Sequence, residues 1–178
     1  MMKHLVKIIF IFWLLFSVAA ASAQAIPKWK IAELESYIKQ ADKPVIINFW
    51  ATFCKPCLEE IPYMQKLVKK YESAGVELLL VNLDAEDVYV KLKPFAAKYG
   101  LKAPVVFLDE TNADIFCPKV DESWSGAIPA TLFLNNKTAY RKFFEEQLTE
   151  AKMEEEIKLL VSGKNKKLPQ EQSATGAH

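Results

Sequence analysis

Hydrophobic residues along the chain form two patterns, a helical spacing and continuous apolar runs. Together these patterns predict alternating helices and strands. A spacing of three or four residues, as in Ile31, Leu34 and Ile38, is typical of one buried face of a helix. A continuous apolar run such as Val45–Trp50 is typical of a strand buried on both faces. We expect helices over 30–41, from the cysteine pair to near Gly75, over 88–99 with Gly100 as its C-cap, and over 148–161. We expect strands over 45–50, 76–83, 104–108, 131–134 and 139–144.

The order of these elements predicts the fold class. Strands that alternate with helices pair in parallel and carry helices on both faces of their sheet. Asn135-Asn136-Lys137 lies between the last two strands and predicts a hairpin turn, which adds antiparallel strands. The mixed segment 111–127 is expected to hold a short helix and a loop. The prediction is an α/β protein, a three-layer α/β/α sandwich with a mixed parallel and antiparallel central sheet.

The first residues have the composition of a signal peptide. Met1–Lys7 carries two lysines and no acid, Ile8–Ala20 is almost wholly apolar, and Ala21-Ser22-Ala23 matches the A-x-A cleavage pattern. We therefore predict a signal peptide over 1–23 and export to the periplasm or the extracytoplasmic face of a bacterial membrane. A retained membrane anchor is the alternative, although a run of 13 residues is short for about 30 Å of hydrocarbon.

The rest of the chain is expected to form one domain over 24–162, followed by a polar, disordered tail over 163–178. Without the signal peptide it holds 21 basic and 22 acidic residues, so its net charge is −1 at neutral pH. This balance argues against nucleic acid or an anionic membrane surface as a partner. We expect a monomer that meets its protein partners through a local surface.

Two of the three cysteines, Cys54 and Cys57, lie three residues apart where a buried strand meets an amphipathic helix. The free N–H groups and the macrodipole at a helix N-terminus favour negative charge and lower the pKa of the first thiol. Cys54 is therefore the expected nucleophile, and Cys57, one turn further into the helix, is the expected resolving thiol. Pro56 suits an early helical position because its missing N–H would be unpaired there anyway. Lys55 adds a positive charge that favours the Cys54 thiolate.

Other roles for a C-x-x-C pair need residues that the sequence lacks. Haem attachment requires a histidine directly after the second cysteine, where the chain has Leu58. Tetrahedral zinc requires four ligands, and the only histidines are His4 in the predicted signal peptide and His178 at the C-terminus. The same scarcity argues against Cys–His protease chemistry, so proton transfer needs a carboxylate or water. An inert structural disulfide remains the alternative to redox catalysis.

The segment Asn48–Cys57, NFWATFCKPC, resembles the active-site segment of the thioredoxin-like superfamily. Its continuation Leu58–Pro62 completes C-x-x-C-x-x-E-x-P, which is similar to the exported TlpA/ResA branch of thiol-disulfide oxidoreductases. Ala127–Thr131 resembles the loop that carries the family's cis-proline. The resemblance covers roughly 44–160 and implies a thioredoxin fold.

The resemblance also implies which residues contact a substrate. Pro129 would be the cis-proline beside the redox pair, and the backbone of Ile128 would pair with an extended substrate segment. Lys55 and Pro56 would contribute to the same contact surface. Trp50 would pack beside the site and shield it, with core packing alone as the alternative.

The resemblance assigns proton transfer to a carboxylate. Glu60 lies one helical turn after Cys57, where the family has its acid, so the two could exchange protons. The alternative is a solvated helix carboxylate like the adjacent Glu59. Asn48 stands where thioredoxins proper have a buried acid, which agrees with the TlpA/ResA branch and leaves proton transfer to Glu60.

Two features depart from the family pattern. Only Ile26–Lys30 precedes the first helix, so the strand hairpin that opens many relatives is expected to be truncated. Cys117 matches no family motif and is expected to be a buried or half-buried free thiol. An accessory redox or intermolecular thiol is the alternative.

These inferences predict a thiol-disulfide oxidoreductase that exchanges the Cys54–Cys57 pair with disulfide-containing or dithiol exported proteins. The favoured direction is reduction, for which a membrane or soluble electron donor must recharge the pair; the opposite direction stays open, because it depends on the reduction potential. No metal or organic cofactor is expected, since the five glycines form no phosphate-binding loop. The alternative is a thioredoxin-fold metal-delivery or binding module without redox turnover, although such relatives use C-x-x-x-C and a distant histidine. Peroxidase relatives use a threonine–cysteine pattern that the chain lacks.

Overall fold

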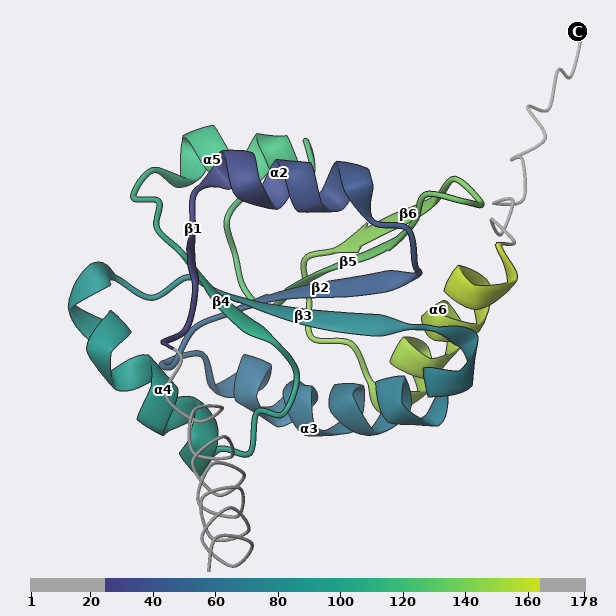
Figure 1. Ribbon diagram of the computed structural model, residues 1–178, viewed down its shortest axis with the longest axis horizontal. Coiled ribbons are helices and arrows are strands. Elements are labelled where there is room, and N and C mark those ends of the chain that lie inside the picture. Colours follow the sequence, from purple (N-terminus) through teal and green to yellow (C-terminus); the bar gives the residue numbers. More distant parts are fainter. Residues whose placement is uncertain (1–24, 164–178) are drawn as a thin grey trace, which may run out of the picture.

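The computed structural model describes residues 25–163. The predicted signal peptide over 1–23, and all but the first residue of the predicted tail over 163–178, lie outside the described residues. The described chain folds around one six-stranded sheet with helices on both faces (Figure 1). The strands are β1 (Lys28–Trp29), β2 (Val45–Trp50), β3 (Glu77–Asn82), β4 (Val105–Leu108), β5 (Ala130–Asn135) and β6 (Tyr140–Phe144). The helices are α2 (Ile31–Gln40), α3 (Lys55–Lys70), α4 (Tyr89–Lys98), α5 (Ala113–Val120) and α6 (Glu150–Ser162), with the short 3-10 helices η2 (Glu72–Ala74) and η3 (Glu86–Val88).

The strands lie in the order β1-β4-β3-β2-β5-β6. The first four of these pair in parallel, whereas β5 pairs antiparallel with both β2 and β6. Figure 1 shows α2 and α5 on one face of the sheet and α3, α4 and α6 on the other. The predicted three-layer sandwich with a mixed sheet is therefore confirmed.

Strand β2 lies inside the sheet and is buried on both faces. Ile46 and Trp50 belong to the core under α3, α4 and α6. Ile47 and Phe49 belong to the core under α2 and α5. Because side chains alternate along a strand, Asn48 shares the side of Ile46 and Trp50. This alternation places an amide beneath the helix that begins after Cys54.

The sequence prediction misses strand β1, which has only two residues. Lys28 and Trp29 pair in parallel with Phe107 and Leu108 of β4, at the edge of the sheet. Two residues provide no period to detect, so the strand is defined by its pairing alone. Within the described residues, β1 is the only strand or helix that precedes α2.

Most predicted boundaries lie within two residues of the observed ones. Helix α6 begins at Glu150 because Thr149 caps it, its hydroxyl accepting a hydrogen bond from the Lys152 N–H at 3.2 Å. Gly163, assigned to the tail from the sequence, is instead the left-handed C-cap of α6, with φ of 66°. Helix α3 ends at Lys70, short of the predicted end, and η2 continues the chain. Within residues 25–163, no helix combines the length and apolarity that crossing a membrane requires.

Candidate active site

The redox pair lies at the N-terminus of α3, a few residues after β2 ends. Cys54 and Cys57 form a disulfide with an S–S distance of 1.97 Å and a Cα–Cα distance of 5.3 Å. Cys54 is the N-cap residue, and its Sγ accepts a hydrogen bond from the Cys57 backbone N–H at 3.3 Å. Cys54 is 6% exposed, whereas Cys57 is fully buried. The more accessible thiol is therefore Cys54, as a nucleophile requires.

The start of α3 favours a thiolate on Cys54. The first N–H groups of a helix lack partners within it, and that of Cys57 already points at Cys54 Sγ. Pro56 occupies the first helical turn, as predicted. The Lys55 side chain is 87% exposed and its Nζ lies 3.7 Å from a carboxylate oxygen of Glu59. Because Glu59 and solvent screen its charge, Lys55 favours the thiolate less than its sequence position suggests.

Glu60 lies one turn after Cys57, on the buried side of α3. Its side chain is fully buried, so the alternative of a solvated carboxylate is wrong. Oε1 accepts a hydrogen bond from the Asn48 amide at 2.8 Å, and Oε2 accepts one from the Leu148 N–H at 3.2 Å. Burial raises the pKa of Glu60 to about 7, although both hydrogen bonds act to lower it. A carboxyl group with this pKa can accept or donate a proton near neutral pH.

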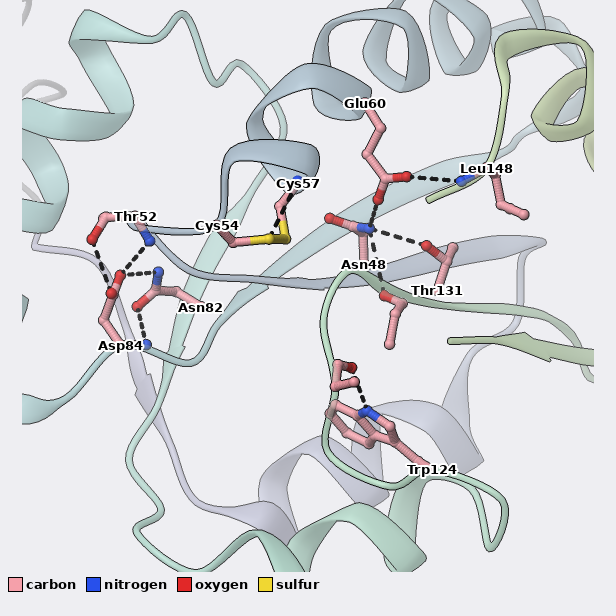
Figure 2. The surroundings of a disulfide bond; sticks show 12 residues. Asn48, Thr52, Cys54, Cys57, Glu60, Asn82, Asp84, Trp124, Thr131 and Leu148 are labelled. Carbon is pink, nitrogen blue, oxygen red and sulfur yellow. Dashed lines mark hydrogen bonds between the residues drawn. A yellow bond between two sulfur atoms is a disulfide. The ribbon is translucent and has the colours of Figure 1, made fainter. Parts of the chain in front are cut away.

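Asn48 connects Glu60 to the central sheet, as Figure 2 shows. Besides its bond to Glu60, Nδ2 donates to the Thr131 hydroxyl at 3.0 Å and faces the Ala130 carbonyl at 3.5 Å. Both partners lie on β5, which pairs with β2 at this point. Asn48 therefore holds the buried carboxyl group of α3 against two strands of the sheet.

A second polar network fixes the turn between β2 and Cys54 (Figure 2). The Asp84 carboxylate, just beyond β3, accepts hydrogen bonds at 2.9 Å from both the N–H and the hydroxyl of Thr52. The Asn82 amide donates to the same carboxylate at 2.7 Å. Asp84 is only 5% exposed, so these bonds satisfy a nearly buried group. They tie the turn before the nucleophile to the neighbouring strand.

The Ile128–Pro129 peptide bond is cis, as predicted. Strand β5 begins at the next residue, Ala130, which pairs with Phe49 of β2 in antiparallel register. The same register, carried one residue further, places Pro129 opposite Trp50. The proline loop and the cysteine turn therefore lie at the same end of the sheet. Ile128 is half-buried and packs against both cores.

Glu145, directly after β6, holds the loop that precedes Pro129. Its carboxylate accepts hydrogen bonds from the backbone N–H groups of Ser125 at 3.0 Å and Ala127 at 2.8 Å, and from the Ser125 hydroxyl at 2.5 Å. The Trp124 indole N–H donates to the Ala127 carbonyl at 2.9 Å. Burial acts to raise the pKa of Glu145, but these hydrogen bonds prevail and hold it below its ordinary value. An ionised carboxylate thus anchors the loop at neutral pH.

Two aromatic residues near the disulfide differ in accessibility. Trp50 is fully buried and stacks on Phe95 with a centroid distance of 6.1 Å. Because the Trp50 side chain is buried, it is not exposed for contact with a substrate, and the predicted substrate contact is not supported. Trp50 instead packs in the core beside the cysteines. Phe53, which immediately precedes Cys54, is 77% exposed. No sequence motif assigns Phe53 a role, and its exposed ring directly precedes the nucleophile in the chain.

Cys117 is a free, buried thiol on α5. Burial raises its pKa to about 11, and the carboxylates of Glu145 and Asp114 act in the same direction. The thiol is thus neutral near pH 7 and behaves as a small apolar side chain, in agreement with the first of the two expectations. Among the described residues, no group of three or more His, Cys, Asp or Glu side chains is arranged to hold a metal ion.

Comparisons with known protein sequences give one family. A family model described as the AhpC/TSA family matches residues 19–141. The thiol-disulfide oxidoreductase ResA of Bacillus anthracis is 49% identical over 63 residues, which cover 35% of this chain and 35% of the relative. ResA of Halalkalibacterium halodurans is 32% identical over 118 residues, which cover 66% of this chain and 62% of the relative. The chain thus matches less than two thirds of the length of either relative.

Solved structures share the fold. A thioredoxin-related protein from Neisseria meningitidis serogroup B is 25% identical with a TM-score of 0.59, over 70% of this chain and 90% of that chain. A secreted thiol-disulfide isomerase from Corynebacterium glutamicum is 21% identical with a TM-score of 0.54, over 70% of this chain and 74% of that chain. At such identity the second likeness concerns the fold alone. The thioredoxin fold implied by the sequence resemblance is confirmed.

Proposed function

Since the chain belongs to the AhpC/TSA family, we propose that it is a thiol-disulfide oxidoreductase of the ResA type that reduces disulfides in exported proteins. One observation carries the proposal. The Cys54–Cys57 disulfide caps a helix whose next turn carries the fully buried Glu60, with a pKa raised by burial to about 7. A structural disulfide needs no proton acceptor, whereas a redox-active pair uses a buried carboxyl group that titrates near neutral pH.

The reaction begins with the reduced enzyme. The Cys54 thiolate attacks one sulfur of a partner disulfide, whose S–S bond breaks while its second sulfur leaves and takes up a proton. A mixed disulfide now joins the partner to Cys54. Cys57 loses its proton to the Glu60 carboxylate and attacks the Cys54 sulfur. The bond between Cys54 and the partner breaks, and the second partner sulfur leaves as a thiolate that takes up a proton. The Cys54–Cys57 disulfide forms, and two electrons have passed from the enzyme to the partner.

The surroundings of Cys54 support contact with an extended segment of the partner. Ile128 precedes the cis-proline, and its backbone is the expected place for strand-like pairing with such a segment. Pro56 and the exposed Lys55 flank the nucleophile on the first turn of α3. The partners are disulfide-containing or dithiol proteins that are recognised largely through their backbone.

Export follows from the signal peptide predicted over 1–23. The structurally similar protein from Corynebacterium glutamicum is described as secreted. Disulfides form and persist outside the cytoplasm, so a reductase there meets its substrates. A membrane or soluble electron donor must then return the Cys54–Cys57 pair to the dithiol state.

Reduction of insulin disulfides tests the proposal. With dithiothreitol as the electron source, the wild-type protein should accelerate insulin precipitation, whereas Cys54→Ser and Cys57→Ser should not. The alternative, a metal-delivery or binding module, predicts the opposite pattern. It requires Cu⁺ or Zn²⁺ binding that both substitutions abolish, and no acceleration of insulin reduction by the wild type.

A further inference from the structure

The side-chain oxygen of Asn48 is a buried acceptor without a partner. Asn48 is fully buried, and its Oδ1 receives no hydrogen bond from the part of the chain that the structure describes. Figure 2 shows this oxygen on the side of the amide away from Thr131, directed toward the disulfide. A buried polar atom without a partner costs free energy, so its presence in the oxidised protein needs a reason.

The contacts of the Asn48 nitrogen fix the orientation of the amide. Nδ2 donates to Glu60 and to the Thr131 hydroxyl, and it faces the Ala130 carbonyl at 3.5 Å. A carbonyl oxygen accepts only, and so does an ionised carboxylate. The reversed amide would set its oxygen against the Ala130 carbonyl at any pH, and against Glu60 as well when that carboxyl group is ionised. The unpartnered oxygen therefore stays on the side of the disulfide.

The reduced protein supplies the missing donor. Reduction breaks the Cys54–Cys57 bond and adds two electrons; Cys57 takes up a proton and becomes a thiol, while the start of α3 favours a thiolate on Cys54. A thiol is a hydrogen-bond donor, and Cys57 is fully buried, so its proton needs a partner inside the protein. We propose that Asn48 is a positioning residue whose Oδ1 accepts a hydrogen bond from the Cys57 thiol in the reduced protein. This inference rests on the proposed redox function but concerns the protein without its partner.

The contact would join the thiol to its proton acceptor through one side chain. Asn48 accepts from Cys57 through its oxygen and donates to Glu60 through its nitrogen. The bond to Cys57 exists only after reduction, because a disulfide sulfur carries no proton. Asn48 therefore favours the dithiol form and makes the protein a weaker reductant than a variant without the amide.

Infrared spectroscopy of the S–H stretch tests the contact directly. In a Cys54→Ser, Cys117→Ala background, Cys57 is the only one of the three cysteines that remains. With Asn48 present, the S–H band of Cys57 should lie at a lower frequency than that of an unbonded thiol. In the Asn48→Leu variant the band should rise to the unbonded frequency. Thr131→Val is the matched control, because it removes another partner of the Asn48 amide but leaves Oδ1 in place. The band should be unchanged in that variant.

Equilibration of the Cys54–Cys57 pair with glutathione gives the second readout. At pH 5, below the pKa of about 7 that burial gives Glu60 in the oxidised protein, its carboxyl group is protonated and adds no charge to that state. Asn48→Leu should shift the equilibrium toward the disulfide by about tenfold, a potential about 30 mV more negative, and Thr131→Val should shift it by less than about twofold. Asn48→Asp is protonated when buried at this pH, retains a carbonyl oxygen and should restore most of the wild-type constant.

Two results would overturn the inference. One is a Cys57 S–H band at the unbonded frequency while Asn48 is intact, a measurement that does not depend on Asn48→Leu folding. The other is a glutathione equilibrium that Asn48→Leu leaves unchanged. Failure of the proposed function alone would give a different result. The protein would not reduce insulin, but its Cys57 S–H band would still lie below the unbonded frequency.

Discussion

The side-chain amide of Asn48 donates a hydrogen bond of 2.8 Å to Oε1 of Glu60. This bond joins β2 to α3, which contains Cys57 and is capped by Cys54. Burial raises the pKa of Glu60 to about 7 despite the hydrogen bond. The charge of Glu60 therefore changes in the pH range in which thiols exchange, which affects both the rate of the reaction and the stability of the fold.

Glu60→Gln should slow resolution of the mixed disulfide. Glutamine cannot accept the Cys57 proton, so release of the partner at pH 8 should fall about 100-fold, within the usual range for the loss of a general base. In the wild type, this rate should rise with pH through about 7, the pKa of Glu60, and the inflection should vanish in the variant. Stopped-flow measurement of partner release between pH 5 and 9 checks both points.

Glu59→Gln is the matched control, because Glu59 is the adjacent carboxylate and is 53% exposed. It should keep the wild-type pH profile. An inflection that persists in Glu60→Gln, or one that disappears in Glu59→Gln, would remove Glu60 from the mechanism.

Glu60 should also make stability depend on pH. Its folded pKa of about 7 exceeds the ordinary value of 4.5, so the folded state binds more protons than the unfolded state between these pH values. The stabilisation is complete below about pH 4.5 and is lost as the pH rises through about 7. Glu60→Gln lacks this dependence and should gain up to about 3 kcal/mol relative to the wild type between pH 4 and pH 8. Urea unfolding of both oxidised proteins at the two pH values measures it, and an equal difference at both would contradict the account.

Features with a local signal are the ones that the sequence predicts well. The apolar run Val45–Trp50 followed by C-x-x-C defines the strand, turn and helix of the site, and the structure places the thiols accordingly. Ala127–Thr131 identifies the cis-proline through family resemblance. The alternation along β2 even places Asn48 on the side of α3, so its contact with Glu60 is within reach of sequence reasoning.

Features that depend on distant pairing are not predicted. Strand β1 is too short to show a period and exists through its pairing with β4. Thr52 and Asp84 are 32 residues apart, and Ser125 and Glu145 are 20 apart. Hydrophobic periods say which side of an element is buried, but they do not say which polar side chain meets which loop.

Glu145→Ala should weaken the binding of protein substrates more than it slows the chemical steps. The carboxylate holds the Ser125 and Ala127 N–H groups of the loop before the cis-proline, so its loss should let that loop move. We expect KM for a protein disulfide to rise about five- to tenfold, as for the loss of charge-assisted hydrogen bonds, with kcat within about twofold. Steady-state kinetics on insulin measure both constants. Glu146→Ala, at the exposed neighbouring position, is the control and should change neither constant. A fall in kcat with an unchanged KM in Glu145→Ala would refute the role of Glu145 in the substrate loop.

Cys117 should resist alkylation in the folded protein. It is 2% exposed, and burial raises its pKa to about 11, so only about one thiol in a thousand is ionised at pH 8. Iodoacetamide at that pH should modify Cys54 of the reduced protein within minutes and Cys117 only after denaturation. Mass spectrometry of peptides from the two conditions distinguishes these outcomes, and rapid labelling of Cys117 in the native state would show that its thiol is reachable.

Trapping of the mixed disulfide shows which cysteine attacks the partner and which one resolves the adduct. Cys57→Ser, incubated with insulin in the absence of other thiols, should accumulate a one-to-one adduct through Cys54, because no second thiol displaces the partner. Cys54→Ser under the same conditions should accumulate none, since Cys57 is fully buried. Non-reducing mass spectrometry identifies the linked cysteine. An adduct formed by Cys54→Ser but not by Cys57→Ser, or by neither variant, would contradict the account.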